Sequence, residues 1–180
     1  GLLGGSLARA LAARGDEVTV LQRRPSGLAD AGLREVLGDV ADPAVAAAAT
    51  AGQEAIVHLA AKVNVTGAWA DYERANVAGT AGLLRAATRA GVASMVFVSS
   101  PSVAHAGSSL VGEGAGPADP AAARGNYARS KAMAERLGAR WLDHVAAEPT
   151  VRRHGPLQVD RAALGELPQV RAVQRLLHDV

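Results

Sequence analysis

Hydrophobic positions follow two alternating periods along the first 140 residues. Four short apolar runs predict β-strands at 18–21, 34–39, 55–61 and 94–100. Segments rich in good helix formers lie between these runs and predict helices before Gly15, from Pro43, over 71–90 and over 126–140. Strands and helices that alternate in this way predict an α/β fold, a doubly wound parallel sheet with right-handed crossovers.

Local signals at the ends of the elements support this reading. Leu3, Leu7 and Leu11 recur at the spacing of one helix face. Asp42 stands directly before Pro43, a combination typical of an N-cap followed by the first residue of a helix.

The pattern changes after Trp141. Residues 144–180 contain scattered prolines, no buried strand and one short amphipathic segment near the end. We therefore divide the chain into an α/β domain at 1–143 and a tail of uncertain order at 144–180. The stretch 101–124 is rich in Gly, Ser, Pro and Ala and predicts a long loop, and loops of this length are often functional lids.

Composition limits the functional classes. The 180 residues are 49% apolar, enough for one domain with a sizeable core. The formal net charge of +2 gives no sign of a nucleic-acid partner. No apolar run approaches the roughly 18 residues of a membrane span, and no export signal is visible, so a cytoplasmic location is the default expectation. The chain has no Cys, which excludes disulfides and thiol chemistry, and we predict no metal site.

Tyr127 and Lys131 are the first candidates for chemistry. They lie four residues apart on a predicted helix, so their side chains share one face. An ammonium group beside a phenol favours the phenolate, which lets a tyrosine exchange a proton with an alcohol or ketone near neutral pH. The chain has two Tyr and two Lys, so this spacing is hard to attribute to chance. The alternative is a helix that exposes an ordinary tyrosine and lysine.

The N-terminal residues predict a glycine-rich turn that enters a helix. Gly1 and Gly4 would let the backbone approach a pyrophosphate, unless the helix start merely happens to be rich in glycine. After the strand at 18–21, Arg23 and Arg24 stand where dinucleotide-binding folds often carry an acid for the ribose hydroxyls. Two guanidinium groups would suit a 2′-phosphate, so we expect NADP in preference to NAD; the alternative is a solvated basic turn.

The C-terminal ends of the strands carry further candidates, because ligands bind at that edge of open parallel sheets. The run 55–61 is almost entirely apolar, as in a strand covered on both faces, and its small Ala60 and Ala61 would let a flat cofactor lie close. Ser100 ends the next strand with a hydroxyl group. We interpret His58 as a core histidine in preference to a catalyst.

Together these segments resemble the extended short-chain dehydrogenase/reductase family (the NAD-dependent epimerase/dehydratase family) over about residues 1–140. The matching segments, in the expected order, are Gly1-Leu2-Leu3-Gly4, Gly38-Asp39-Val40, His58-Leu59-Ala60-Ala61, Asn76-Val77-Ala78-Gly79-Thr80, Val98-Ser99-Ser100 and Tyr127…Lys131. Each segment alone is weak evidence for the family, but six segments in the expected order are strong evidence. The residues of these segments are most similar to those of the 3β-hydroxysteroid and sterol dehydrogenase branch, although nucleotide-sugar epimerases and dehydratases share most of them.

The resemblance implies a cofactor site. Gly1 and Gly4 would be the last two glycines of a three-glycine pyrophosphate turn, and Asp39 would contact adenine. Ala60 and Ala61 would pass beside the cofactor.

The resemblance also implies a catalytic trio of Ser100, Tyr127 and Lys131. Tyr127 would give or take the proton, while Lys131 would hold the phenolate and grip the nicotinamide ribose, and both residues would therefore touch the cofactor. Ser100 would hydrogen-bond the reacting oxygen. Asn76 would brace the site, unless it is a helix-interior residue bonded to neighbouring backbone. Ser102 is a weaker candidate for substrate contact, and we expect Ser99 to be structural.

The sequence departs from the family at both ends. The family's first strand and first glycine would lie upstream of Gly1, so we expect 1–143 to be an NAD(P)-binding Rossmann-like domain that lacks its first strand. The strands at 18–21 and 55–60 would then lose their shared partner. The family's next strand and substrate-binding lobe are not found in 141–180, so the fold is expected to be truncated at both ends.

The leading functional hypothesis is an NAD(P)-dependent oxidoreductase that transfers a hydride to or from a secondary alcohol or ketone, similar to 3β-hydroxysteroid dehydrogenases. The alternatives are a nucleotide-sugar epimerase or dehydratase, a non-catalytic nucleotide-binding fragment, and a remnant that does not fold stably. The expected partners are a small-molecule substrate and, as one option, a second copy of the chain; neither nucleic acid nor a membrane is expected.

Overall fold

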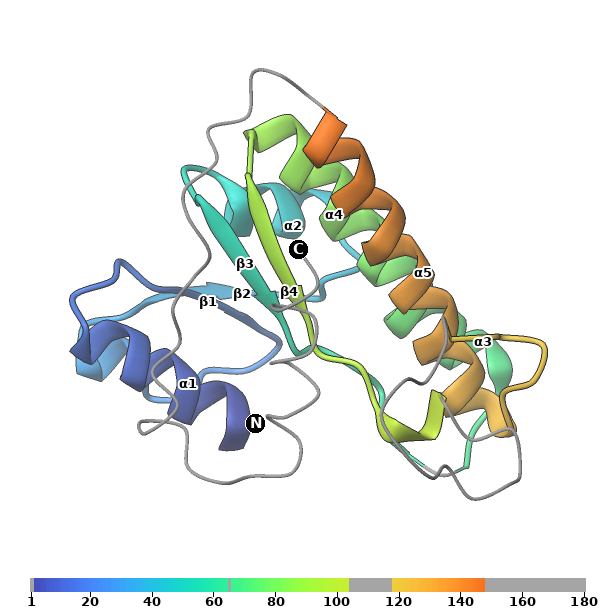
Figure 1. The fold of residues 1–180 in the computed structure, drawn as a ribbon. Coiled ribbons are helices and arrows are strands. Elements are labelled where there is room, and N and C mark those ends of the chain that lie inside the picture. Colours follow the sequence, from blue (N-terminus) through green and yellow to red (C-terminus); the bar gives the residue numbers. More distant parts are fainter. Residues whose placement is uncertain (1, 65, 104–117, 148–180) are drawn as a thin grey trace.

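The fold is α/β with parallel strands, as the sequence predicts (Figure 1). The computed structural model describes residues 2–64, 66–103 and 118–147. The strands are β1 (Thr19–Gln22), β2 (Arg34–Leu37), β3 (Ala55–His58) and β4 (Ser94–Phe97). The α-helices are α1 (Leu2–Ala13), α2 (Pro43–Thr50), α3 (Trp69–Tyr72), α4 (Gly79–Ala90) and α5 (Gly125–Ala147). Short 3-10 turns occupy Ala29–Ala31 and Pro101–Val103.

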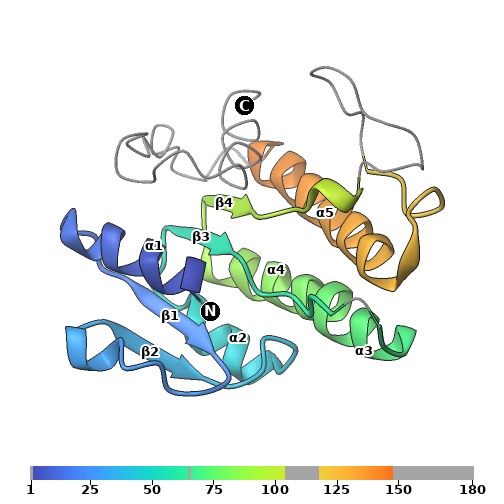
Figure 2. The ribbon, with the colours of Figure 1, turned by 90° about the horizontal axis from the view of Figure 1, so that it is seen from below.

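The four strands form two parallel pairs instead of one continuous sheet. β1 pairs with β2, and β3 pairs with β4. Figure 2 shows the strands in the order β2, β1, β3, β4 across the molecule, but no ladder joins β1 to β3 within the described ranges. This break lies where the sequence predicts that two strands lose their shared partner.

Each strand is four residues long, and three of them are shorter than the apolar runs that predict them. β3 ends at His58 and β4 ends at Phe97. One further hydrogen bond, from Val98 N–H to the His58 carbonyl at 3.1 Å, continues the ladder before the two chains separate. Each strand has one strand partner in the described ranges, so a single row of hydrogen bonds holds it in the extended conformation. The apolar runs therefore leave the sheet before they end.

α2 begins as the sequence predicts. The Asp42 carboxylate caps it by accepting hydrogen bonds from the Ala44 and Val45 N–H groups, and Pro43 is its first residue. Gly38 makes the turn between β2 and α2 at φ 155°, where a Cβ would lie 2.5 Å from a Val45 methyl group. Only glycine therefore fits this turn.

The predicted helix at 71–90 is present but interrupted. It begins two residues earlier, as α3, and passes through a π-helical turn at Glu73–Ala78 before continuing as α4. Gly91 ends α4 in the left-handed conformation, at φ 72°. Hydrophobic periodicity does not distinguish a single π turn from α-helix, so the sequence misses this interruption.

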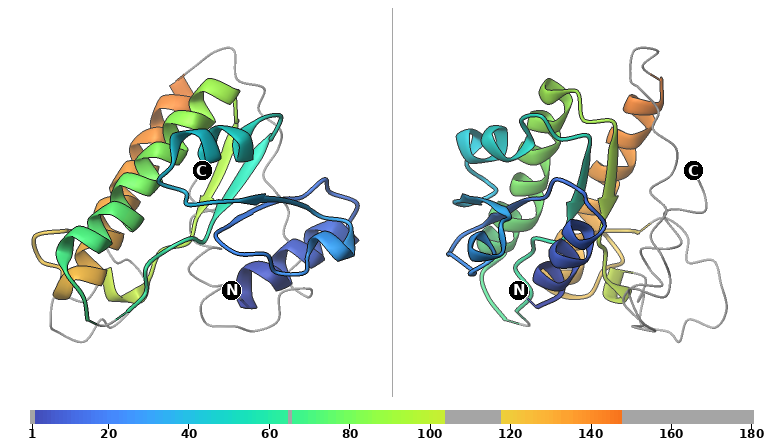
Figure 3. Two further views of the ribbon diagram at one scale, coloured as in Figure 1. Left: turned by 180° about the vertical axis from the view of Figure 1, so that it is seen from behind. Right: turned by 90° about the vertical axis from the view of Figure 1, so that its left-hand side faces the viewer.

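The helices build two separate apolar clusters. In Figure 3, α4 and α5 lie along each other beside the β3–β4 pair. The cluster between them consists of Leu84, Ala87, Val92, Met95, Phe97, Ala134 and Trp141. A smaller cluster, of Ala8, Leu28 and Leu33, joins α1 to the β1–β2 pair.

α5 runs through Ala147, four residues past the boundary set from the sequence at 143; residues 148–180 lie outside the described residues. Among the helices of the described ranges, none combines the length and the apolar character that a bilayer crossing requires.

Candidate functional site

Lys131 is the most deeply buried of the charged candidate residues. Its side chain projects from α5 toward the end of β4, is 3% exposed, and donates a hydrogen bond to the Val98 carbonyl at 2.7 Å. The ammonium also lies 4.1 Å from the centre of the Phe97 ring. Burial disfavours the charged form and lowers the pKa of Lys131 to about 8, while the Glu135 carboxylate acts in the opposite direction.

The other two members of the predicted trio lie on the segments that Lys131 joins. Tyr127 is half-buried in the first turn of α5, four residues before Lys131. Ser100 is half-buried two residues after Val98, and its hydroxyl lies 2.9 Å from the Ser102 hydroxyl. The hydrogen bond from Lys131 to Val98 therefore ties the helix that carries Tyr127 to the segment that carries Ser100.

Asn76 connects three segments from inside the π-helical turn. Its amide accepts a hydrogen bond from Lys62 N–H at 2.6 Å and donates to the Lys62 carbonyl at 3.1 Å and to the Ser130 hydroxyl at 2.8 Å. The Ser130 hydroxyl donates in turn to the Tyr127 carbonyl at 2.8 Å. Asn76, which is 1% exposed, thus holds the chain after β3 against the first turn of α5. π turns of this kind occur frequently at functional sites.

Ser130 is a residue of this network that the sequence reasoning misses. Its position in the sequence could have indicated this role. A serine inside a helix commonly bonds the carbonyl three or four residues earlier, and Ser130 lies between Tyr127 and Lys131.

His58 is a core residue, as predicted. Its Nε2 lies 2.9 Å from the Thr80 hydroxyl, which itself donates to the Asn76 carbonyl at 2.6 Å, so the imidazole is the donor to Thr80. Burial, and secondly the nearby charge of Lys131, lower the pKa of His58 to about 4. The ring is therefore neutral at pH 7 and does not act as a charged group beside Lys131.

The start of α1 differs from the predicted turn. The helix already begins at Leu2, so Gly4 lies within its first turn instead of preceding it; Gly1 lies outside the described residues. A Cβ at Gly4 or Gly5 would meet no atom within 4 Å. This open backbone at a helix N-terminus fits the close approach of a large anionic group.

Asp39 is fixed in place at the end of β2. Its carboxylate accepts a hydrogen bond from Ala41 N–H at 3.0 Å and forms an ion pair with Arg74 at 3.0 Å. The Ala41 hydrogen bond is the main cause that holds the pKa of Asp39 below its usual value, and partial burial opposes it. The charges of Arg74 and Arg23 lower the pKa further. Arg74 comes from the π-helical turn, 35 residues along the chain, so no local spacing in the sequence predicts this ion pair.

The remaining predicted cofactor residues are accessible. Arg23 and Arg24 are exposed beyond β1, and no described residue bonds to their guanidinium groups. Ala60 is exposed and Ala61 is half-buried beyond β3.

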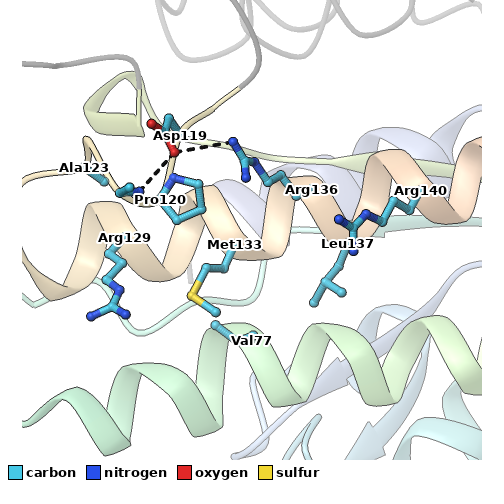
Figure 4. Close-up of a pocket in the computed structure, with 10 residues that line it drawn as sticks. Val77, Asp119, Pro120, Ala123, Arg129, Met133, Arg136, Leu137 and Arg140 are labelled. Atoms are coloured by element: carbon cyan, nitrogen blue, oxygen red, sulfur yellow. Dashed lines mark hydrogen bonds and ion pairs between the residues drawn. The ribbon is translucent and has the colours of Figure 1, made fainter.

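A cavity of about 630 Å³ lies along a different face of α5 (Figure 4). Its lining residues include Val77, Met133, Leu137 and three arginines, Arg129, Arg136 and Arg140. Tyr127, Lys131 and Ser100 do not line it, so this hollow is separate from the candidate catalytic residues.

The chain matches the NAD dependent epimerase/dehydratase family over residues 1–153. It belongs to this family. Relatives in several of its branches are similar to this chain, so the family match does not by itself select a branch.

Two relatives illustrate this spread. The chain is 35% identical over 139 residues to a 2-alkyl-3-oxoalkanoate reductase of Stenotrophomonas maltophilia, covering 75% of this chain and 42% of the relative. It is 38% identical over 120 residues to a 3β-hydroxysteroid dehydrogenase/Δ5→4-isomerase of Mycobacterium tuberculosis, covering 62% of this chain and 32% of the relative. The chain thus spans less than half the length of these epimerase/dehydratase-family relatives.

Solved structures of short-chain dehydrogenase/reductase and dehydratase proteins are also similar to this chain. A short-chain dehydrogenase/reductase superfamily protein of Agrobacterium tumefaciens with bound NAD has a TM-score of 0.67 at 32% identity, over 77% of this chain and 41% of that one. The dTDP-glucose 4,6-dehydratase DesIV of Streptomyces venezuelae, as a double mutant with NAD bound, has a TM-score of 0.67 at 31% identity, over 78% of this chain and 48% of that one. Both contain NAD.

Proposed function

We propose that this chain is the cofactor-binding part of an NAD(P)-dependent oxidoreductase that moves a hydride to or from a secondary alcohol or ketone. The observation that carries the proposal is the buried ammonium of Lys131, one helical turn from Tyr127 and bonded to the segment that leads into Ser100. A buried ammonium is costly, so such an arrangement points to chemistry. Membership of the epimerase/dehydratase family supports the same class of reaction.

The residues present fit a dinucleotide. The open backbone at Gly4 would receive the pyrophosphate, Asp39 would face adenine, and Ala60 and Ala61 would border the bound group. When bound, the nicotinamide supplies or accepts the hydride.

The protein's own side chains handle the proton. Tyr127 donates a proton to the carbonyl oxygen in reduction and takes one from the alcohol in oxidation. Lys131, one helical turn from Tyr127, would bind the nicotinamide ribose. The Ser100 hydroxyl orients the reacting oxygen by a hydrogen bond. Asn76 holds the chain after β3 against the first turn of α5, which carries Tyr127.

For the substrate, we infer a hydroxyl or keto group on an apolar molecule, as in the 3β-hydroxysteroid branch. The hydroxysteroid dehydrogenase and oxoalkanoate reductase names of the relatives support this choice. A nucleotide sugar is the second candidate, favoured by the 34% identity over 134 residues to a dTDP-glucose 4,6-dehydratase of Streptomyces niveus.

The decisive experiment replaces Tyr127 by Phe. Hydride transfer to a panel of ketones, followed at 340 nm, should fall by about 10³-fold or more, because the proton has no donor. Cofactor binding by calorimetry should remain within about twofold. Tyr72→Phe is the matched control, since it removes the other phenol of the chain, whose hydroxyl donates to backbone carbonyls of Asn64 and Thr66.

The outcomes separate the candidate functions. Unchanged turnover in Tyr127→Phe contradicts the proposal. Conversion of a nucleotide sugar without net cofactor reduction selects the second candidate, and cofactor binding with no turnover of any substrate indicates a nucleotide-binding fragment. Running the calorimetry with both NAD and NADP tests the role of Arg23 and Arg24; tighter binding of NADP is expected.

A further inference from the structure

Two side chains of α5 form hydrogen bonds with two consecutive residues that directly follow β4. Lys131 donates to the Val98 carbonyl at 2.7 Å. Glu135, one helical turn later on the same face, accepts a hydrogen bond from the Ser99 hydroxyl. Ser99 therefore has a structural role: it fixes the position of the Glu135 carboxylate relative to the buried Lys131 ammonium.

Among the described residues around Lys131, the other groups that contact its ammonium are uncharged. The Phe97 ring from β4 lies beside the ammonium, and His58 from β3 is neutral at pH 7. The Val98 carbonyl gives one hydrogen bond, and Tyr127 lies one turn earlier on α5. Among the charged groups that act on Lys131, Glu135 is the one that favours the ammonium.

The carboxylate acts through space. No ion pair joins Lys131 to Glu135, although the structure describes both side chains. In a poorly hydrated site, a charge beyond hydrogen-bond distance still contributes, because little water screens it. The hydrogen bond from Ser99 favours the position in which the Glu135 carboxylate lies beside β4 over one turned toward solvent.

We propose that Glu135 is a positioning residue: held by the Ser99 hydroxyl, its carboxylate keeps the buried Lys131 side chain charged at the end of β4. The consequence for catalysis, an ammonium that stays available to Tyr127, rests on the proposed function. The electrostatic effect on Lys131 does not.

The two lysines of the chain make a direct test practical. With lysine labelled by ¹³C at Cε, NMR gives two titrating signals, Lys62 and Lys131, which a Lys62→Arg variant assigns. The variant Glu135→Gln keeps an oxygen acceptor for Ser99 but removes the charge. The midpoint of Lys131 should move to lower pH in this variant, while that of Lys62 stays in place.

Glu17→Gln is the matched control, because it removes the same charge from an exposed position after α1 and should move neither signal. Ser99→Ala is the second variant, and it should move the Lys131 midpoint in the same direction by a smaller amount. An unchanged Lys131 midpoint in Glu135→Gln overturns the proposal. If Glu135→Gln does not fold, an unchanged midpoint in Ser99→Ala overturns it instead.

Activity provides a separate readout. In Glu135→Gln the rate of alcohol oxidation should begin to fall at a lower pH than in the wild type, as Lys131 loses its proton earlier. Failure of Tyr127→Phe to reduce turnover would contradict the proposed function, yet the NMR shift of Lys131 would still support the role of Glu135.

Discussion

At the scale of single residues, burial sets the charge state around the site. His58 shows this most clearly, because its pKa is about 4 in the folded chain against 6.5 for the free side chain. Between these two values the unfolded chain binds more protons than the folded one. Stability that is present above pH 6.5 is therefore lost as the pH falls toward 4.

We expect the acid sensitivity of the chain to depend on His58. Its share of the loss in unfolding free energy between pH 7 and pH 4 should be about 3 kcal/mol. His58→Gln, which can still bond Thr80, should flatten this dependence in urea unfolding measured at several pH values. His144→Gln, an exposed histidine of α5, should not change it. Equal slopes in the wild type and His58→Gln would contradict the assignment.

At the scale of elements, periodicity and end signals predict most of the helices. The N-cap Asp42, the α4 terminator Gly91 and the helix carrying Tyr127 and Lys131 follow from local chemistry, which the sequence displays directly. The π turn that positions Asn76 could not be predicted, since a single extra residue per turn leaves no periodic trace. The strand lengths were overestimated because they depend on neighbouring strands rather than on the run itself.

Side-chain contacts between distant segments were the least predictable part of the site. The ion pair of Arg74 with Asp39 and the bond of Asn76 to Ser130 join residues 35 and 54 positions apart. No spacing rule reaches that far, so the family resemblance could nominate Asp39 and Asn76 but not their partners.

The first turn of α1 gives a prediction for the glycines. Gly4→Ala and Gly5→Ala should each stabilise the chain by up to about 1 kcal/mol, because alanine favours helix and the added methyl group meets no atom. If Gly4 faces the pyrophosphate, Gly4→Ala should also weaken dinucleotide binding by about tenfold or more, which corresponds to 1.4 kcal/mol. Thermal melts and calorimetry measure the two effects. Equal binding by both variants would remove Gly4 from the cofactor site.

At the scale of the whole molecule, the chain has two cores of unequal size. The cluster of α4, α5 and β4 holds seven buried residues, whereas the cluster beneath α1 holds three. α2 bridges them by packing on both strands of the β1–β2 pair and on α4. Regions with few buried apolar contacts open at lower free energy than the main core.

We therefore expect hydrogen exchange to divide the chain. Amides of β1 and β2 should exchange at least about tenfold faster than amides of β3 and β4, a difference of 1.4 kcal/mol in opening free energy. Mass spectrometry of the exchanged peptides measures both pairs in one experiment. Identical opening free energies would indicate that the two clusters unfold as one unit.

The break between β1 and β3 has a consequence for handling the protein. Each of these strands has one edge without a strand partner in the described ranges, and neither contains the proline or lysine that commonly blunts such edges. Unpaired edges template the addition of strands from other chains, so aggregation should grow with protein concentration and temperature. Dilute, cool conditions should therefore limit aggregation, with light scattering as the simplest monitor.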